Sequence, residues 1–154
     1  MATEAEERLS AIVLAAGAGQ RMGGPKAILV VSGEPLARVH ARRLREAGCG
    51  GVVIVTRAEL ATRFVRDASV AVSGAPDPAG SLAIGLRALA PSPQDLVVIT
   101  PVDAWPARVE TIAQLVRAVR QGAEAATPLR EGRGGHPVVV RARVLDPAAP
   151  PRFA

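Results

Sequence analysis

Residues 11–26 read AIVLAAGAGQRMGGPK, an apolar run that passes directly into a glycine-rich segment. The run at 11–16 is short, continuous and stopped by glycine, which predicts a strand buried on both faces of a sheet. Segment 17–25 predicts a loop, because its four glycines disfavour regular structure. Glycines also let backbone N–H groups approach a phosphate chain closely. The stretch therefore predicts a first strand that leads into a phosphate-binding loop.

The glycine spacing differs from that of two common nucleotide-binding motifs. A dinucleotide-binding fingerprint requires a third glycine at the place where Met22 stands. A Walker A loop requires glycine, lysine and a hydroxyl residue in succession, whereas Pro25 precedes the lysine here and Ala27 follows it. Both motifs are therefore poor matches, and the loop needs another explanation.

Beyond this stretch the chain alternates apolar runs with helical patterns. The expected strands are 52–56, 70–73, 96–100, 125–128 and 138–141, and the expected helices are 35–47, 59–66, 81–90 with Ser81 as its N-cap, and 106–121. This alternation predicts a three-layer α/β/α, Rossmann-like fold with a mainly parallel sheet, in one domain over 11–145. Residues 1–10 and 146–154 are expected to be flexible ends. Ligands bind at the carboxyl ends of strands in such sheets, here after residues 16 and 100.

Composition excludes several classes of protein. The 154 residues are 49% hydrophobic and contain no apolar run of about 18, so disorder and a membrane span are not expected. Aromatic residues make up 2% and the arginines behind the net charge of +5 are spread along the chain, which argues against nucleic acid as a partner. The single Cys49 excludes a disulfide framework and a cysteine zinc cluster. The acidic, polar start does not resemble a secretory signal, so a cytoplasmic protein is expected.

The basic residues point back to the glycine-rich loop. Eighteen of the nineteen are arginine, and the single lysine is Lys26. A lysine ammonium is a compact point charge, unlike the planar guanidinium of arginine. Its placement therefore suggests a site that requires a compact cation.

A third explanation of the loop fits at every position. Residues 14–26 match the pattern L-A-(A or G)-G-x-(G or S)-x-R-M-G-x-P-K, so the stretch resembles the signature of nucleotidyltransferases. The close spacing of Arg21 and Lys26 is most similar to the molybdenum-cofactor branch, the cytidylyltransferases and guanylyltransferases and their relatives. The resemblance implies a fold of the nucleotide-diphospho-sugar transferase type. It also implies transfer of a nucleoside monophosphate from CTP or GTP to a phosphorylated small molecule, molybdopterin in that branch, with release of pyrophosphate.

The implied chemistry accounts for the residue types in the loop. Negative charge grows on the leaving β- and γ-phosphates, and Arg21 and Lys26 are expected to neutralise it as the catalytic residues. The resemblance places Leu14, Ala15, Ala16, Gly17 and Gly19 against the nucleotide. An acceptor phosphate is already anionic at neutral pH, so no enzyme nucleophile or general base is required.

Asp103 is the candidate for a second part of the site. It follows the run at 96–100, where a carboxylate can hold Mg²⁺ between the α- and β-phosphates. The family has a metal-binding Asp at this strand end, usually as Asp-x-Pro, whereas Pro106 comes one place later here. The alternative is that Asp103 caps the helix expected at 106–121.

Two other segments resemble family features near the substrates. Gly80 and Ser81 are similar to a turn beside the base and ribose, and Asp77 just before them is expected to face the nucleotide. The ordinary alternative for Ser81 is a helix N-cap. Residues 134–137 resemble a Gly-His-Pro stretch on the acceptor side, although a lone His136 in a turn is more often structural.

The resemblance covers about residues 12 to 145 and contains no late Asp-x-Asp motif. The acceptor half is therefore expected to be incomplete, lost, or supplied by a partner, either a molybdoenzyme or a second copy of the chain. Triphosphate binding with slow transfer is the expected behaviour. Two other readings remain open: a nucleotide-binding accessory or catalytically impaired homologue, and a cytidylyltransferase or uridylyltransferase for a different phosphate ester.

Overall fold

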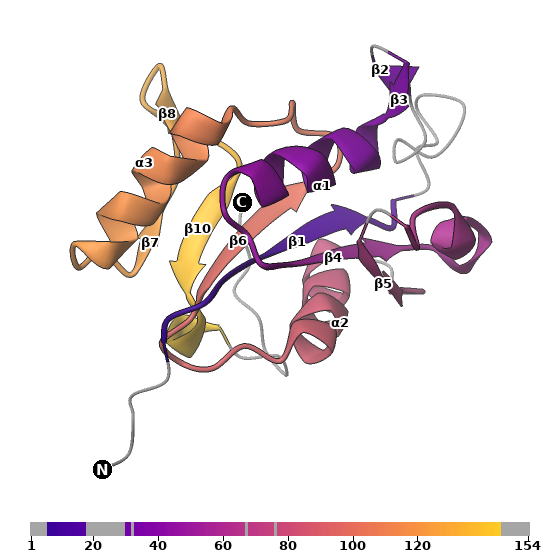
Figure 1. Ribbon diagram of the computed structural model, residues 1–154, viewed down its shortest axis with the longest axis horizontal. Coiled ribbons are helices and arrows are strands. Elements are labelled where there is room, and N and C mark those ends of the chain that lie inside the picture. The colour runs from indigo at the N-terminus through magenta and orange to yellow at the C-terminus, as the bar shows by residue number, and fades with distance from the viewer. Residues whose placement is uncertain (1–5, 18–29, 32, 67, 76, 146–154) are drawn as a thin grey trace.

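Strand β1 (Leu9–Ala15) lies at the centre of a six-stranded sheet, with a parallel neighbour on each side (Figure 1). The computed structural model describes residues 6–17, 30–31, 33–66, 68–75 and 77–145. Its sheet has the order β5-β4-β1-β6-β10-β7, in which the first four strands are parallel and β10 is antiparallel to both of its neighbours. The other strands are β4 (Gly51–Thr56), β5 (Ser69–Val72), β6 (Leu96–Pro101), β7 (Ala125–Ala126) and β10 (Val138–Arg141).

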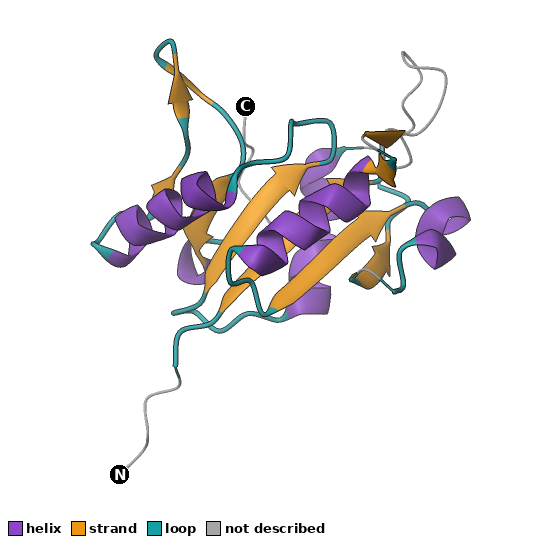
Figure 2. Ribbon diagram, turned by 45° about the horizontal axis from the view of Figure 1, so that its top comes forward, coloured by secondary structure: helices purple, strands orange, loops and turns teal. Residues whose placement is uncertain are grey.

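Helices cover both faces of this sheet (Figure 2). Helices α1 (Leu36–Glu46) and α3 (Val109–Arg120) pack on one face with Ala11 and Val13 of β1. Helix α2 (Pro78–Leu89) packs on the other face with Ile12. Alternation along β1 thus sends successive side chains into two separate cores, which confirms the three-layer, mainly parallel fold expected from the sequence.

Shorter elements complete the chain. They are two 3₁₀ turns, η3 (Ala58–Arg63) and η4 (Ala142–Val144), and the short pairs β2 (Val30–Val31) with β3 (Glu34–Pro35) and β8 (Leu129–Arg130) with β9 (Arg133–Gly134). Figure 2 shows the β8–β9 hairpin projecting from the layers. In the described part of the chain, no helix is long and apolar enough to cross a membrane.

Five elements expected from the sequence differ in their bounds or type. Helix α2 begins at Pro78 and not after Ser81, because the Asp77 side chain caps it by accepting a 2.7 Å hydrogen bond from the Gly80 amide. The segment expected to be a helix at 59–66 is the 3₁₀ turn η3. Helix α3 begins at Val109, because Pro106 belongs to the preceding loop. Of the strand expected at 125–128, only Ala125–Ala126 is a strand, β7. Strand β1 starts at Leu9 and not at residue 11.

Helix α2 lies unusually close to the sheet at Gly85. A Cβ atom at this position would lie 2.9 Å from Ile12 Cγ2 and 3.0 Å from Val55 Cγ2. Glycine is therefore required by the close approach of helix and strands, and the contact fixes α2 against β1 and β4.

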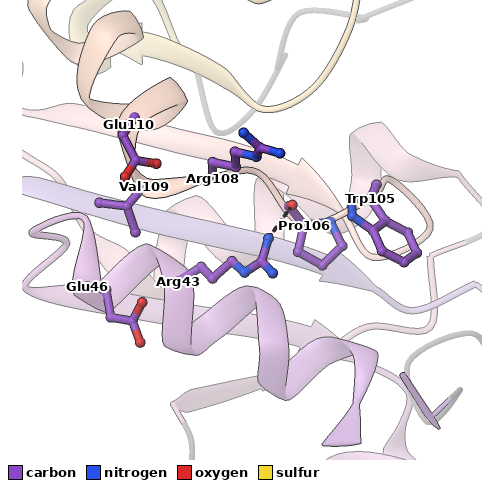
Figure 3. Close-up of a pocket in the computed structure, with 7 residues that line it drawn as sticks. All are labelled: Arg43, Glu46, Trp105, Pro106, Arg108, Val109 and Glu110. Carbon is purple, nitrogen blue, oxygen red and sulfur yellow. Dashed lines mark hydrogen bonds between the residues drawn. The ribbon is translucent and has the colours of Figure 1, made fainter. Parts of the chain in front are cut away.

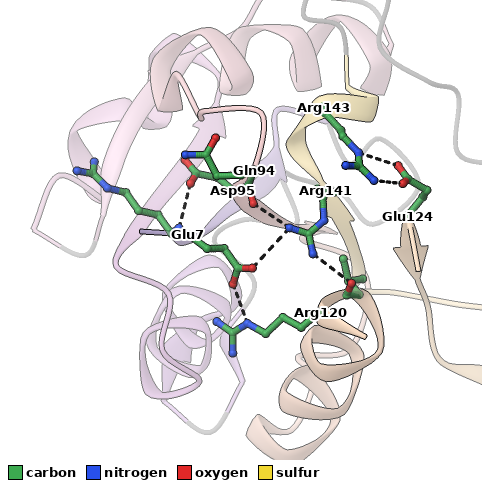
Figure 4. Close-up of polar contacts among 9 residues, drawn as sticks. Glu7, Gln94, Asp95, Arg120, Glu124, Arg141 and Arg143 are labelled. Atoms are coloured by element: carbon green, nitrogen blue, oxygen red, sulfur yellow. Dashed lines mark hydrogen bonds and ion pairs between the residues drawn. The ribbon is translucent and has the colours of Figure 1, made fainter. Parts of the chain in front are cut away.

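A polar cluster ties the amino ends of β1 and β6 together (Figure 4). The Asp95 side chain, 4% exposed, accepts 2.9 Å hydrogen bonds from the backbone amides of Arg8 and Ser92. The Arg141 guanidinium donates to the carbonyls of Gln94 at 3.0 Å and Val119 at 3.2 Å. These contacts fix the amino end of the sheet. The candidate site lies at the opposite, carboxyl end.

Candidate nucleotide-binding site

The two main parts of the expected site meet at the carboxyl ends of β1 and β6. The Val102 amide donates a 2.8 Å hydrogen bond to the Leu14 carbonyl, which extends the β1–β6 pairing beyond Pro101. The start of the glycine-rich loop and Asp103 therefore lie side by side. This edge is also a topological switch point, since the chain places β4 on one side of β1 and β6 on the other.

The described part of the glycine-rich loop becomes more exposed as it leaves β1. Ala15 is buried in the sheet, Leu14 and Ala16 are half-buried, and Gly17 is exposed. Among the described residues, nothing lies within 4 Å of a Cβ atom placed on Gly17. No described residue therefore fills the space beside the backbone where the loop leaves β1. The other residues assigned to this loop, Gly19, Arg21 and Lys26, lie outside the described residues.

Asp103 is exposed directly after β6 and does not cap the following helix. The N-cap of α3 is Arg108, five residues further along the chain. The capping alternative for Asp103 is therefore wrong, whereas its metal-binding role stays a prediction.

Helix α1 holds the loop that carries Asp103. The His40 Nε2–H donates to the Val102 carbonyl at 3.1 Å, and the Arg43 Nη1 donates to the Pro106 carbonyl at 2.8 Å. His40 is only 2% exposed. Burial is the main cause that lowers the pKa of the His40 imidazole, and Arg43 adds to the lowering, against the hydrogen bonds to the backbone and the charge of Asp103.

The predicted residues on the β4 side of the site gather at the start of α2. The Ser81 hydroxyl is buried and lies 2.8 Å from the Ser73 hydroxyl. Asp77 is exposed and occupied in capping α2, and a Cβ atom on Gly80 would lie 2.7 Å from the Ala75 Cβ. The structure therefore brings Asp77, Gly80 and Ser81 together and gives each a role in the fold. Their contact with a nucleotide stays a prediction.

This group is joined to β1 through Thr56 at the end of β4. The Thr56 hydroxyl donates to the Ala15 carbonyl at 3.2 Å, and the Thr56 carbonyl accepts from the Ser73 amide at 2.8 Å. The start of α2 and the glycine-rich loop are therefore parts of one connected edge.

His136 lies at the same edge of the sheet. It is exposed and precedes β10, whose first residue, Val138, pairs with Ile99 near the carboxyl end of β6. The antiparallel direction of β10 thus brings its amino end to the site. The stretch that resembles the acceptor-side motif therefore lies beside β6, the strand that precedes Asp103. The antiparallel direction of β10 was not predicted from the sequence.

A groove between α1 and α3 was not expected from the sequence (Figure 3). Its volume is about 460 Å³, and it is lined by Arg43, Glu46, Trp105, Pro106, Arg108, Val109 and Glu110. Figure 3 shows Trp105 at one end of the groove and Glu46 and Glu110 toward the other. Trp105 is 74% exposed and belongs to the same short loop as Asp103.

The carboxylate at the site fits Mg²⁺ that arrives with a substrate. Among the described residues, no group of three or more His, Cys, Asp and Glu side chains can hold a metal ion alone. Mg²⁺ commonly uses one or two carboxylates and completes its octahedron with water and substrate phosphates. Asp103, exposed beside the start of the loop, suits that arrangement.

Comparison with known proteins gives the family. A model described as the MobA-like NTP transferase domain matches residues 11–150. The probable molybdenum cofactor guanylyltransferase of Opitutus terrae is 37% identical over 116 residues, which are 74% of this chain and 57% of that protein. The molybdenum cofactor guanylyltransferase of Cupriavidus taiwanensis is 31% identical over 127 residues, 81% of this chain and 63% of that protein. The chain thus spans about three fifths of the length of these relatives.

A solved structure agrees on the fold. The Mycobacterium sp. strain JC1 homologue of Mycobacterium tuberculosis Rv0371c superposes with a TM-score of 0.74 at 22% identity, covering 89% of this chain and 71% of that chain. Since the family model spans most of the sequence and both curated relatives exceed 30% identity, the chain belongs to the MobA-like NTP transferase domain family.

Proposed function

We propose that this protein transfers a nucleoside monophosphate from a nucleoside triphosphate to a phosphorylated small molecule and releases pyrophosphate. GTP is the donor and molybdopterin the acceptor favoured by the names of the two curated relatives. The observation that carries the proposal is the 2.8 Å hydrogen bond between Val102 and Leu14. It holds the backbone next to Asp103 beside the end of β1, from which the glycine-rich loop leaves, at the switch point of a parallel sheet.

The proposed reaction relies on positioning and electrostatics. The acceptor phosphate attacks the α-phosphorus, and the bond to the pyrophosphate leaving group breaks. Arg21 and Lys26 neutralise the charge that develops on that leaving group. A cation about 4 Å from one phosphate charge contributes roughly 4 kcal/mol at an effective dielectric of about 20, before desolvation is subtracted.

Asp103 is the residue that would hold Mg²⁺ in this scheme. When bound, the ion supplies charge neutralisation on the phosphate oxygens. Asp103 orients this charge from the end of β6, while the backbone of residues 14–17 orients the triphosphate from the end of β1. Both contributions come from elements that the sheet holds in register.

A nucleotide panel tests the proposal. The purified protein is titrated calorimetrically with GTP, CTP, ATP and UTP, each with and without Mg²⁺. Pyrophosphate release is then followed with molybdopterin and other phosphate esters. Mg²⁺-dependent GTP binding and molybdopterin-dependent release support the proposal.

Each other outcome points to a different function. Binding without release under any condition identifies a nucleotide-binding accessory protein. Release with CTP or UTP and another phosphate ester identifies a transferase of different specificity. Absence of binding to all four triphosphates contradicts the proposed function altogether.

A further inference from the structure

The peptide groups on both sides of Asp103 are fixed by hydrogen bonds. The preceding peptide group contains the Val102 carbonyl, which accepts from His40 Nε2 at 3.1 Å. The following peptide group contains the Ala104 amide, which donates to the Pro101 carbonyl at 3.2 Å. One peptide earlier, the Val102 amide is held by Leu14 at 2.8 Å. The backbone from which the Asp103 carboxylate projects is therefore pinned on each side.

Two of the contacts to this loop come from one helix. His40 and Arg43 are one turn apart on α1 and bind the carbonyls of Val102 and Pro106, at the two ends of the loop 102–106. Both carbonyls lie about sixty residues from these donors in sequence. A loop that long-range side-chain donors hold in addition to its own turn is less free to move than one held by its turn alone. Helix α1 therefore contacts this loop at both ends, an arrangement termed the clamp.

We propose that His40 and Arg43 are positioning residues, which hold the loop 102–106 so that the Asp103 carboxylate faces the triphosphate site. Neither side chain is required to touch a substrate. The proposal rests on the proposed function for the role of Asp103, but the clamp itself is a separate claim about the loop. A displacement of a carboxylate by about 1 Å can greatly reduce its contribution to binding or catalysis. Fixing the loop is therefore expected to matter for function.

The chain contains its own reporter for this loop. It has one tryptophan and no tyrosine, and the tryptophan is Trp105, between the two clamped carbonyls. Its indole is 74% exposed, so its rotational freedom depends on the backbone that carries it more than on packing. Fluorescence excited in the indole band therefore reports on this loop alone.

The chain also offers a matched control. Arg42 is the neighbour of Arg43 on the same helix, but it is exposed and forms a 2.6 Å ion pair with Glu34 away from the loop. Arg42→Ala removes the same side-chain type from the same turn without releasing a loop carbonyl. For His40, the conservative variant His40→Gln keeps an N–H donor, whereas His40→Ala removes it.

The experiment combines two readouts on His40→Ala, His40→Gln, Arg43→Ala and Arg42→Ala, below the melting temperature of each variant. Time-resolved fluorescence anisotropy measures the local motion of Trp105, and calorimetry measures GTP affinity with and without Mg²⁺. We expect His40→Ala and Arg43→Ala to increase the amplitude of fast Trp105 motion and to reduce the Mg²⁺-dependent gain in GTP affinity by about tenfold. GTP affinity without Mg²⁺ should stay near wild type, His40→Gln should restore much of both signals, and Arg42→Ala should change neither.

Unchanged anisotropy in folded Arg43→Ala and His40→Ala overturns the clamp, and so does a loosened loop with an unchanged Mg²⁺ response. If His40→Ala does not fold, Arg43→Ala and His40→Gln still decide the matter. A wild-type protein that binds no triphosphate contradicts the proposed function. In that case the anisotropy measurements alone decide whether α1 holds the loop.

Discussion

The Val102 amide donates a 2.8 Å hydrogen bond to the Leu14 carbonyl. The glycine-rich loop and the loop that carries Asp103 therefore leave the sheet from adjacent positions on β1 and β6. Residues that are 88 positions apart in the chain are thereby held next to each other by backbone alone. The arrangement does not depend on which side chains occupy these two positions. It depends on the register of β1 with β6, which the apolar strands set.

Asp103→Asn should abolish the Mg²⁺-dependent gain in triphosphate affinity without unfolding the protein. An amide keeps the shape of the side chain but loses the charge that a hard divalent cation requires. Because Asp103 is exposed and caps no helix, the free energy of unfolding should change by about 0.5 kcal/mol or less. Calorimetry with and without Mg²⁺, together with a melting curve, tests both parts. A variant that melts well below wild type and keeps its Mg²⁺ response would assign Asp103 a structural role.

Lys26→Ala should weaken triphosphate binding more than monophosphate binding. The lysine is expected at the β- and γ-phosphates, which a monophosphate lacks. Loss of one such contact should reduce GTP affinity by about tenfold or more, equivalent to about 1.4 kcal/mol, and leave GMP affinity within about threefold. Arg117→Ala, on the exposed face of α3, is the control for loss of one positive charge. Equal losses for GTP and GMP would contradict this placement of Lys26.

Asp95→Ala should destabilise the protein and leave the nucleotide site intact. The substitution leaves the Arg8 and Ser92 amides without their acceptor at a nearly buried position. The free energy of unfolding should fall by about 2 to 4 kcal/mol, measured by urea denaturation. The exposed ion pair of Glu124 with Arg143 supplies the comparison, since Glu124→Ala should lower the free energy of unfolding far less than Asp95→Ala does. A large loss of GTP affinity in folded Asp95→Ala would show that the two ends of the sheet are coupled.

Gly85→Ala should also be destabilising, although alanine favours helices. A Cβ atom 2.9 Å from Ile12 Cγ2 forces helix and strand apart, and such overpacking costs about 1 to 3 kcal/mol. The gain in helix propensity is about 1 kcal/mol, so a net loss is expected. The melting temperature should fall by a few degrees, about 2 to 4 °C per kcal/mol for a domain of this size. Gly74→Ala, where a Cβ atom meets no described residue within 4 Å, should show no comparable fall.

Cys49 should be inert in the folded protein. Burial raises the pKa of its thiol from an ordinary 9.0 to about 12, so almost no thiolate is present at pH 8. A disulfide reagent at pH 8 should react slowly with the native protein and rapidly after unfolding. Rapid reaction with the native protein would show that the thiol is accessible.

The same shift gives a pH dependence of stability. The folded state keeps the thiol proton longer than the unfolded state, so the contribution of Cys49 is complete below pH 9 and is lost as the pH rises toward 12. The wild type should therefore lose stability in this interval faster than Cys49→Ala. Parallel curves for the two proteins would contradict the assigned pKa.

Much of the fold follows from patterns that local chemistry sets. The strands around Ile12, Ile54 and Val98 are continuous apolar runs, since each is buried on both faces, and the parallel core of the sheet is predictable from them. The meeting of the loop after β1 with Asp103 follows from the same rule, because carboxyl ends of parallel strands share an edge. The signal that starts α2 was present as Asp77 before Pro78, but the surrounding glycine and prolines indicated a loop.

Other features depend on partners that are distant in sequence. His40 shows no local sign of its function, because its acceptor, Val102, lies 62 residues away. The groove beside Trp105 likewise requires the packing of α1 against α3. The position of His40 on an expected helix is the only sequence signal for its role. That position does not specify which carbonyl the imidazole binds.

The central place of β1 has a consequence for how the protein is made. Its partner β6 pairs Leu9 with Leu96 and Leu14 with Pro101, so one of the two ladders of β1 is missing until residue 101 has been synthesised. At about 5 to 20 residues per second, the nascent chain spends roughly 4 to 17 seconds between Ala15 and that point. During this interval an apolar strand has an unpaired edge that other chains can add to. Newly made molecules are therefore most exposed to aggregation during translation, and chaperones that cover the first strand should improve the yield of folded protein.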